Sequence, residues 1–503
     1  MPVDRFPIVG SLTDRNVNAT TSDTTDQRFE NCFPEVIVNP LTQKTSIFLN
    51  KRHGAAASAN VQSGAQGRQG SVVWTSNASA GAADAPVVLS FVKSGNAAII
   101  FFNAETLAQI GADVATSGTA NCLYMSQSNV GGVANLTASI VDGSSPETWF
   151  FPAGGSWTQV TDGDFPSDVT PLHAHMDGFM FVMTETGRIY NSDLNSLSAW
   201  TANNYITADS FADKGVGVVR YGKYLLGFGD VSGEFFYNAG NQSGSVLARI
   251  PELTFQVGAV RNGVTGVPAI KAIGDNVYWI GQNAASGARG VYRLKGTQPQ
   301  KISTPAIDKL VSNGQITNTL GGFSMLGMTH IVFGTAGFLS WCYCVDTGYW
   351  WVLKFGGSSA IAGVGFIGAV NFEKVSKSYF TNSIDAKVWS FSPTSPVWQD
   401  NALSYTATVQ TQNMDSGTRR RKFFSGITLI GDKQASTSNV GVSFSDNDYG
   451  AFSTARNIDM SATQPARLAR LGASRRRSWQ LTHSANTPMR LEAMEIEYEV
   501  GQN

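Results

Sequence analysis

The sequence predicts an all-β protein in which a β-propeller is joined to an additional antiparallel β platform. Apolar runs of about four to eight residues recur between clusters of glycine, asparagine, aspartate and serine, and helical periodicity is almost absent. Glycine, with 52 residues, and aromatic residues, at 11%, are both frequent. Short strands joined by tight turns produce this combination, because glycine adopts positive φ angles and aromatic side chains fill pleated surfaces.

The propeller is predicted from a repeated order of elements: a strand, a turn, an aromatic-rich strand, a second turn and a strand ending near Tyr, Phe or Trp. Units with this order begin at Val87, His173, Gly217, Ile270, Gly322 and near Ile367, and a less regular unit lies near Cys122. Their spacing is close to the roughly 40 to 50 residues of propeller blades. Residues 71–396 are therefore predicted to form about six or seven blades, with a β-sandwich or lectin-like assembly of hairpins as the alternative.

The flanking segments differ in composition from the propeller. Residues 1–53 contain strands interrupted by Pro34 and Pro40, and residues 54–70 are rich in Gly, Ala, Ser and Gln, which predicts a flexible linker. Residues 397–503 contain longer alternating strands, in the last of which Met494, Ile496, Tyr498 and Val500 share one face. We expect residues 397–503 to form the β platform and the N-terminal strands to pack with it.

Composition excludes several classes of protein. With 36 Lys and Arg against 37 Asp and Glu, the chain is less basic than proteins that grip nucleic acid by counterion release. The four cysteines fit no zinc pattern, and no P-loop, GxSxG or HExxH motif is present, so no catalytic, metal or cofactor residue is expected. Neither a signal peptide nor a membrane helix is expected, and therefore no stable membrane insertion.

The C-terminal region carries a recognisable series of elements: a Ser-Asp-rich turn, an aromatic residue, an arginine, an Arg-Leu-Gly element and an arginine-rich strand. These positions are Ser445, Asp446, Gly450, Phe452, Arg456, Arg470, Leu471, Gly472, Arg475, Arg476 and Arg477. Together with the succession of blade-like units and the N-terminal EVIVNPLTQKTSIFLNKRHG, they make the chain resemble the tail hub or nozzle proteins of podovirus-type bacteriophages, also called packaged-DNA stabilisation proteins. Phe452 stands where tryptophan is commoner in that family.

The resemblance implies a structural virion protein of a short tail that assembles in the host cytoplasm. Such a protein forms a hexameric ring below the portal and the tail adaptor, helps to retain the packaged genome, and anchors tail fibres or spikes. Double-stranded DNA passes its channel without sequence specificity, and a near-neutral chain suits a conduit because each basic contact adds grip. The alternatives are a carbohydrate-binding propeller for receptor recognition and a phage glycosidase or depolymerase, which needs two suitably separated carboxylates.

The densest basic run, Arg419, Arg420, Arg421 and Lys422, lies between two predicted strands. We expect it either in a channel or inter-subunit loop near DNA phosphate, or in a solvated hairpin that meets acidic groups of a neighbouring subunit.

Two other groups of side chains have structural interpretations. Arg475, Arg476 and Arg477 precede a strand and are expected to pair with the acidic face formed by Glu495, Glu497 and Glu499. His173 and His175 lie two residues apart, on one side of a predicted strand, and are expected to be polar residues at a blade edge.

Overall fold

The computed structural model describes most of the chain. The described residues are 3–8, 28–38, 41, 43–74, 87–95, 98–116, 120–142, 146–261, 268–314, 316–335, 339–355, 368–372, 377–382, 385–391, 396–464 and 467–501.

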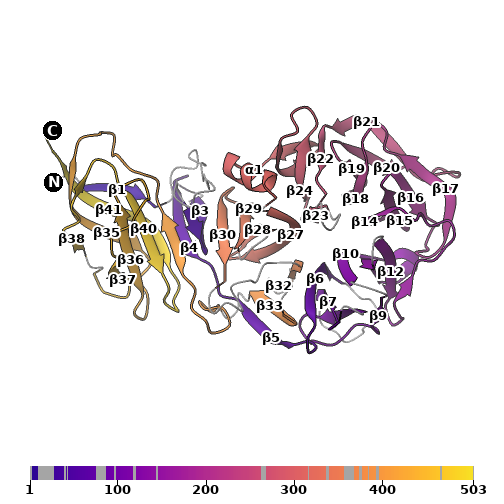
Figure 1. Cartoon of the computed structure of the whole chain (residues 1–503), viewed down its shortest axis with the longest axis horizontal. Coiled ribbons are helices and arrows are strands. Elements are labelled where there is room, and N and C mark those ends of the chain that lie inside the picture. Colours follow the sequence, from indigo (N-terminus) through magenta and orange to yellow (C-terminus); the bar gives the residue numbers. More distant parts are fainter. Residues whose placement is uncertain are drawn as a thin grey trace.

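A β-propeller forms the larger part of the molecule, and within the described residues it has seven blades (Figure 1). The first blade contains β6 (Gln66–Val73), β7 (Val87–Val92), β8 (Ala98–Asn103) and β9 (Val114–Ala115). The second contains β10 (Ala120–Ser128), β11 (Asn135–Asp142), β12 (Pro146–Pro152) and β13 (Thr158–Gln159). The third contains β14 (Val169–Met176), β15 (Phe179–Thr184), β16 (Arg188–Ser192) and β17 (Trp200–Thr207). A 3₁₀ turn, η1 (Val130–Gly132), follows β10.

The next two blades are β18 (Gly215–Tyr221), β19 (Tyr224–Gly229), β20 (Gly233–Asn238) and β21 (Leu247–Phe255); and β22 (Val257–Ala259), β23 (Ile270–Ile273), β24 (Asn276–Asn283), β25 (Arg289–Lys295) and β26 (Gln298–Lys301). After α1 (Pro305–Ser312), the last two are β27 (Ile316–Met325), β28 (Met328–Thr335), β29 (Leu339–Cys344) and β30 (Trp350–Lys354); and β31 (Gly368–Phe372), β32 (Lys377–Thr381), β33 (Lys387–Phe391) and β5 (Ala56–Asn60).

Tight hairpins explain how the blade pattern arises from the sequence. Between β14 and β15, Met176 pairs with Phe179, which leaves Asp177 and Gly178 as the two turn residues. Both have positive φ angles, 53° and 83°. An Asp-Gly pair is a preferred sequence for such a two-residue turn, because it matches the twist of the flanking strands.

The ring of blades is closed by a strand from near the N-terminus. The innermost strands contact one another around the axis in the order β6, β10, β14, β18, β23, β27 and β31, and β31 contacts β6. In the last blade β5 pairs with β33, where Ala57 lies opposite Trp389. The two ends of the propeller are thereby joined in one sheet, so that unfolding this blade opens the ring.

The predicted flexible linker over residues 54–70 is wrong. This segment contains β5 and the first part of β6, both paired within blades. Its small residues permit close approach of the backbone: a Cβ atom on Gly67 would lie 2.4 Å from the Asn382 carbonyl oxygen, and one on Gly54 would lie 2.0 Å from that of Gln399. The low apolar content reflects tight packing, which composition alone does not distinguish from flexibility.

The platform consists of two sheets and confirms the predicted antiparallel β domain that includes N-terminal strands. One sheet contains β1 (Val3–Pro7), β3 (Cys32–Val38), β4 (Thr45–Lys51), β35 (Lys422–Gly431), β38 (Leu468–Ala469), β39 (Ala473–Ser474) and β41 (Arg490–Val500). The other contains β2 (Arg28–Glu30), β34 (Ala407–Gln410), β36 (Asn439–Ser445), β37 (Arg456–Asp459) and β40 (Ser478–His483).

The second platform sheet is continuous with a propeller blade. Glu30 of β2 pairs in parallel with Val352 of β30, and β2 pairs on its other side with β34. One hydrophobic cluster extends across this junction and includes Phe29, Trp351 and Trp479. The platform and the propeller therefore share both a sheet and a core.

A buried ion pair lies at the same junction. Arg52 and Asp400 have no exposed side-chain surface, and two guanidinium nitrogens donate to the two carboxylate oxygens at 2.8 and 2.6 Å. Arg52 Nε donates to Asn31 Oδ1 at 2.9 Å, and the Tyr405 ring lies 3.8 Å from the guanidinium carbon. Each polar atom of this pair is thus satisfied, as a buried charge requires.

None of the helices within the described ranges is long and apolar enough to cross a membrane.

Candidate functional site at the outer end of the platform

The basic run separates into one buried and three exposed residues. Lys422 is fully buried, and its ammonium group donates to the carbonyl oxygens of Thr418, Arg420 and Arg475 at 2.6, 3.2 and 2.6 Å. Burial lowers the pKa of Lys422, whereas nearby Asp415 opposes this shift. The prediction that Lys422 faces DNA or a neighbouring subunit is wrong, because its donors are occupied in holding the turn that presents the arginines.

Arg477 is a structural residue and does not pair as predicted. Its side chain is 1% exposed, and its Nε and one terminal nitrogen donate to the Asp446 carboxylate at 2.7 and 2.8 Å. The Phe424 and Phe444 rings lie 4.2 and 3.8 Å from the guanidinium carbon. Stacking between two rings desolvates the cation, which explains why it requires a carboxylate partner.

The expected pairing with Glu495, Glu497 and Glu499 is also wrong for Arg476, which precedes Arg477. Arg476 forms an ion pair with Asp448 on the Ser-Asp-rich turn, and Glu497 is paired instead with Arg467. The hydrogen bond from Arg467 lowers the pKa of Glu497. The turn lies closer to residues 476 and 477 than the acidic strand does, which alternation along the sequence does not show.

Arg470, Leu471 and Gly472 of the predicted platform motif form the loop between β38 and β39, and Arg456 lies on β37. Leu471 is buried, its carbonyl oxygen accepts from Arg477 at 2.7 Å, and the Gly472 carbonyl oxygen accepts from the Phe424 amide at 2.9 Å. Arg470 is exposed with a positive φ of 58°, and Arg456 donates to the Ala469 carbonyl oxygen at 2.5 Å. The Arg-Leu-Gly element is thus a loop that fixes Arg477.

Within the Ser-Asp-rich turn, the backbone is held by Ser445 and Asn447. Ser445 Oγ accepts from the Tyr449 amide at 3.1 Å, and Asn447 Oδ1 accepts from the Ala451 amide at 3.0 Å. The Asp446 carboxylate is therefore left for Arg477.

The exposed arginines of the two basic segments meet around one hollow, which we call the basic groove. It has a volume of about 780 Å³. It is lined by Asp415, Arg419, Arg421, Asp446, Ala473, Ser474, Arg475 and Arg476. Four arginines and two aspartates line the groove, and one of these aspartates, Asp446, is bound to Arg477. The groove therefore carries net positive charge.

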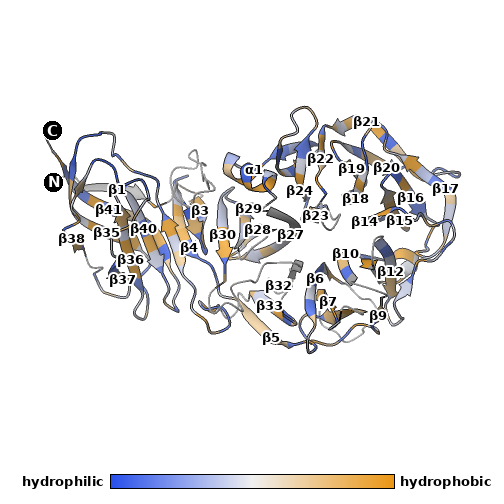
Figure 2. Ribbon diagram, viewed as in Figure 1, coloured by the Kyte–Doolittle hydropathy of each residue, from blue (hydrophilic) through white to orange (hydrophobic). Residues whose placement is uncertain are grey.

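The basic groove lies at the end of the platform away from the propeller. The Gly501 amide donates to the Arg421 carbonyl oxygen at 2.7 Å, and the C-terminus lies at that end in Figure 1. Phe423 and Val500, which are 51% and 42% exposed, lie beside Lys422 on β35 and opposite it on β41. Figure 2 shows largely hydrophilic loops at this end of the molecule. A basic surface with exposed apolar side chains beside it is suited to bind an acidic or phosphate-bearing partner.

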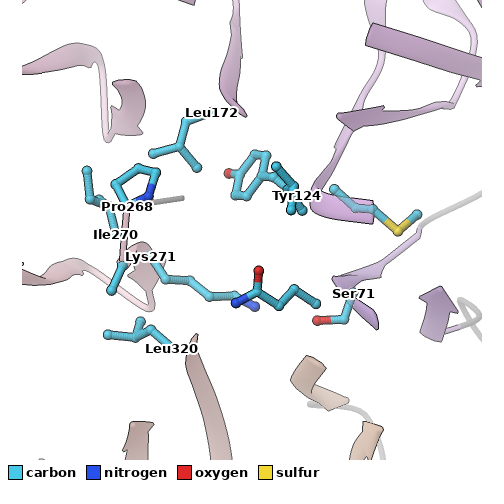
Figure 3. Close-up of a pocket in the computed structure, with 11 residues that line it drawn as sticks. Ser71, Tyr124, Leu172, Pro268, Ile270, Lys271 and Leu320 are labelled. Carbon is cyan, nitrogen blue, oxygen red and sulfur yellow. The ribbon is translucent and has the colours of Figure 1, made fainter. Parts of the chain in front are cut away.

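The axis of the propeller is nearly closed. The central cavity, here called the axial cavity, has a volume of about 40 Å³, and Figure 3 shows the Lys271 side chain extending into it between Tyr124 and Leu320. Burial lowers the pKa of Lys271 to about 8. The cavity has room for a few water molecules, because about 10 to 15 Å³ of this volume is needed to hold one. A DNA duplex does not fit in it.

A second hollow opens at one end of the axis, around His173 and His175, and is called the mouth pocket. Both histidines lie on β14, the edge strand that faces the axis, and they are 1% and 9% exposed. His173 Nδ1 is 3.1 Å from Ser139 Oγ, and His175 Nε2 is 3.1 Å from Ser126 Oγ. Burial, together with nearby Arg220, lowers the pKa of His175 to about 3, so its ring is neutral at pH 7.

In the part of the chain that the structure describes, no three His, Cys, Asp or Glu side chains lie close enough together to hold a metal ion. The four cysteines are free and buried.

One family model matches part of the chain. The family described as "Bacteriophage P22 Gp10, beta-propeller" matches residues 103–319, from the end of β8 into β27. The similarity supports a phage structural protein with a stabilising role, and hence a virion component. The match covers four complete blades and ends before the platform, so the C-terminal motif that carries much of the sequence resemblance lies outside it. No curated protein sequence matches the chain.

Several solved structures match the chain at low identity. The virginiamycin B lyase from Staphylococcus aureus is 10% identical with a TM-score of 0.42, over 68% of this chain and 98% of that one. YCF48 from Cyanidioschyzon merolae is 11% identical with a TM-score of 0.38, over 68% and 99%. Raptor from Chaetomium thermophilum is 11% identical with a TM-score of 0.42, and this chain spans only 29% of its length.

Proposed function

We propose that this protein is a non-enzymatic subunit of a short phage tail, in which six copies form a hub or nozzle ring below the portal and adaptor. In this proposal the platforms make the ring and the propellers project outward, where they anchor fibres or spikes. The observation that carries it is the convergence of Arg419, Arg421, Arg475 and Arg476 at the outer end of a platform whose propeller matches a phage stabilisation family.

The closed axis supports a channel between subunits. Because the axial cavity holds about 40 Å³, a DNA channel formed by this protein has to run through a ring of several chains. A ring requires that each subunit present a surface to the next. The basic groove and the exposed Phe423 and Val500 provide a surface of mixed charge and apolar area at one end of the chain.

The rigid connection of platform and propeller supports the same arrangement. A load on an attached fibre would pass from the propeller to the ring through the sheet that β30 and β2 share and through the buried Arg52–Asp400 pair. A linker of flexible chain would not transmit it. This continuity suits a tail component that keeps its geometry while the genome is ejected.

The test is charge reversal in the basic groove. The variant carries Arg421→Glu and Arg475→Glu, and the matched control carries Arg289→Glu and Lys295→Glu, which reverse two exposed cations on the propeller. Each is supplied from a plasmid to phage that lack the protein, and its copy number in purified particles is measured by mass spectrometry. Thermal melting of each purified chain shows that it is folded.

We expect the control to enter particles at the wild-type level and the groove variant to be reduced at least tenfold. Equal incorporation of both variants would show that the basic groove takes no part in assembly. Native mass spectrometry and electron microscopy of tails test the ring itself, and a six-fold ring containing this chain is the expected result. Particles that contain one copy per tail, or none, would overturn the hub assignment.

A further inference from the structure

The mouth pocket contains buried polar atoms that have no hydrogen-bond partner in the protein. Ser128 Oγ and His175 Nδ1 are buried atoms of this kind, and both residues line the pocket. A buried polar group without a partner costs free energy, so such groups in a folded protein need an explanation. Because both residues line the pocket, a ligand that fills it would lie beside these groups without partners.

The pocket has the size of a small polar ligand. Its volume is about 310 Å³, at the lower limit of the roughly 300 to 1,000 Å³ typical of small-molecule sites. It is formed by the last residues of β10, β14 and β18, with Ala272 from β23, so four blades contribute to it. Residues on edge strands of neighbouring rigid sheets hold fixed positions, which favours a preformed site.

The chemistry of the lining is polar without a net charge. The His175 ring is neutral, and the two charged side chains in the pocket, Arg220 and Asp177, have opposite signs. Tyr124 contributes an aromatic ring, whose edge-to-face neighbour is His173 with 5.0 Å between ring centroids. Neutral donors and acceptors beside an aromatic ring match a molecule with many hydroxyl groups and apolar C–H faces.

We propose that the mouth pocket binds one sugar unit of a carbohydrate, with hydroxyl groups bonded to Ser128, His175 and Arg220 and a C–H face against Tyr124. Free hexoses and the sugar units of a bacterial surface polysaccharide share this chemistry. In the full particle a sugar-binding propeller would contact the cell envelope. Binding itself does not depend on the proposed ring, and a chain that fails to assemble can still be tested.

Saturation-transfer NMR on the purified full-length chain tests the site. The probes are D-glucose, D-galactose, L-rhamnose and N-acetyl-D-glucosamine at millimolar concentration, and a purified O-polysaccharide forms a separate arm. We expect transfer to the ring protons of at least one probe. Transfer to the polysaccharide alone would assign the site to a surface glycan, whereas transfer to a free hexose alone would assign it to a soluble sugar.

Three variants locate the binding. Ala272→Trp places a large ring in the pocket from an exposed position and should abolish transfer. Arg220→Ala should weaken affinity about ten- to a hundredfold, as expected for one hydrogen bond to a charged donor. Lys223→Ala removes an exposed cation from the adjacent β18–β19 turn and should leave affinity unchanged. The melting temperature of each variant checks that it is folded.

Two results would overturn the proposal. One is the absence of saturation transfer from the protein to any of the sugars or to the polysaccharide. The other is transfer that persists in folded Ala272→Trp, which would place binding elsewhere on the molecule.

Discussion

The buried cations of the platform and two buried neutral groups at the mouth of the propeller differ in how their hydrogen-bonding atoms are satisfied. Where the platform buries a cation, the cation has a full set of partners: Arg477 meets Asp446, Lys422 meets three carbonyl oxygens, and Arg52 at the junction meets Asp400. At the mouth of the propeller, Ser128 and His175 keep atoms without protein partners. Buried cations whose hydrogen bonds are all made hold the fold together. Neutral groups without a partner beside a pocket indicate a place where another molecule can bind.

The largest expected effect is at the junction of the platform and the propeller. In Asp400→Ala, Arg52 remains buried without its carboxylate partner, and the Ala55 amide loses its acceptor at 2.9 Å. We expect the free energy of unfolding to fall by about 3 to 5 kcal/mol, as for other broken buried pairs. Urea denaturation followed by tryptophan fluorescence measures it.

The control for this substitution is an ion pair on the propeller surface. Asp113→Ala removes the partner of Lys93, and both side chains are more than a third exposed. Exposed pairs contribute about 1 kcal/mol or less. If Asp400→Ala and Asp113→Ala cost the same, the Arg52–Asp400 pair does not hold the two parts of the molecule together.

The Ser-Asp-rich turn offers a second comparison between neighbouring aspartates. Asp446→Ala leaves buried Arg477 without two hydrogen bonds, and we expect a loss of about 1.5 to 3 kcal/mol. Asp448→Ala removes the partner of Arg476, in a pair whose side chains are 55% and 54% exposed, and should cost about 1 kcal/mol or less. Urea denaturation of both variants checks the order, and a larger loss for Asp448→Ala would contradict it.

The pH dependence of stability follows from the five histidines. Burial lowers the pKa of each of them: that of His53 to about 4, those of His175, His330 and His483 to about 3, and that of His173 well below its ordinary value. The unfolded chain takes up these protons near pH 6.5, but the folded chain does not. The contribution of these neutral histidines to the free energy of unfolding is therefore fully present above pH 6.5. It falls as the pH decreases toward 4, by about 1.4 kcal/mol per pH unit for each histidine.

Urea denaturation at pH 7.5 and 5.5 measures this loss. His175→Gln removes one titrating group from the mouth pocket and should reduce the loss between these two pH values by about 1.4 kcal/mol in total, which lowers the mean slope. A slope that does not change in this variant would show that His175 is not held neutral by burial.

The sequence predicted the type of fold because each blade carries its own local signal. Alternating apolar residues, paired glycines and aromatic strand ends recur with a nearly constant spacing, and each hairpin forms between neighbours in the chain. The closing strand β5 was missed because its sequence, Ala56–Asn60, is small and polar and its partner β33 lies more than 300 residues away. Only the geometry of ring closure identifies that segment as a strand.

The candidate site was predicted in part. Both arginine clusters were identified from charge density, but nothing in their separation along the chain shows that Arg421 and Arg475 line the same groove. The sequence also gave no means to separate Lys422 and Arg477, which are buried, from the exposed arginines beside them, because burial depends on strand register and on the turn that covers each residue. The mouth pocket had only a weak signal in the spacing of His173 and His175.

The smallest expected effect tests how finely the basic run is divided. Arg419 and Arg421 line the basic groove, whereas exposed Arg420 between them does not. The backbone of residue 420 makes two hydrogen bonds: its carbonyl oxygen accepts from Lys422, and its amide donates to Thr418 Oγ1 at 3.2 Å. An alanine keeps both. Arg420→Ala should therefore change the free energy of unfolding by no more than about 0.5 kcal/mol and leave incorporation into particles unaltered.

Arg421→Ala is the matched comparison, because it removes the same charge one residue further along the chain. It should also leave stability nearly unchanged, yet reduce incorporation several-fold, since its guanidinium faces the groove. Equal incorporation of the two variants would mean that the run acts through its total charge. A difference between them would mean that a partner reads the positions of individual arginines, which net charge along the sequence cannot specify.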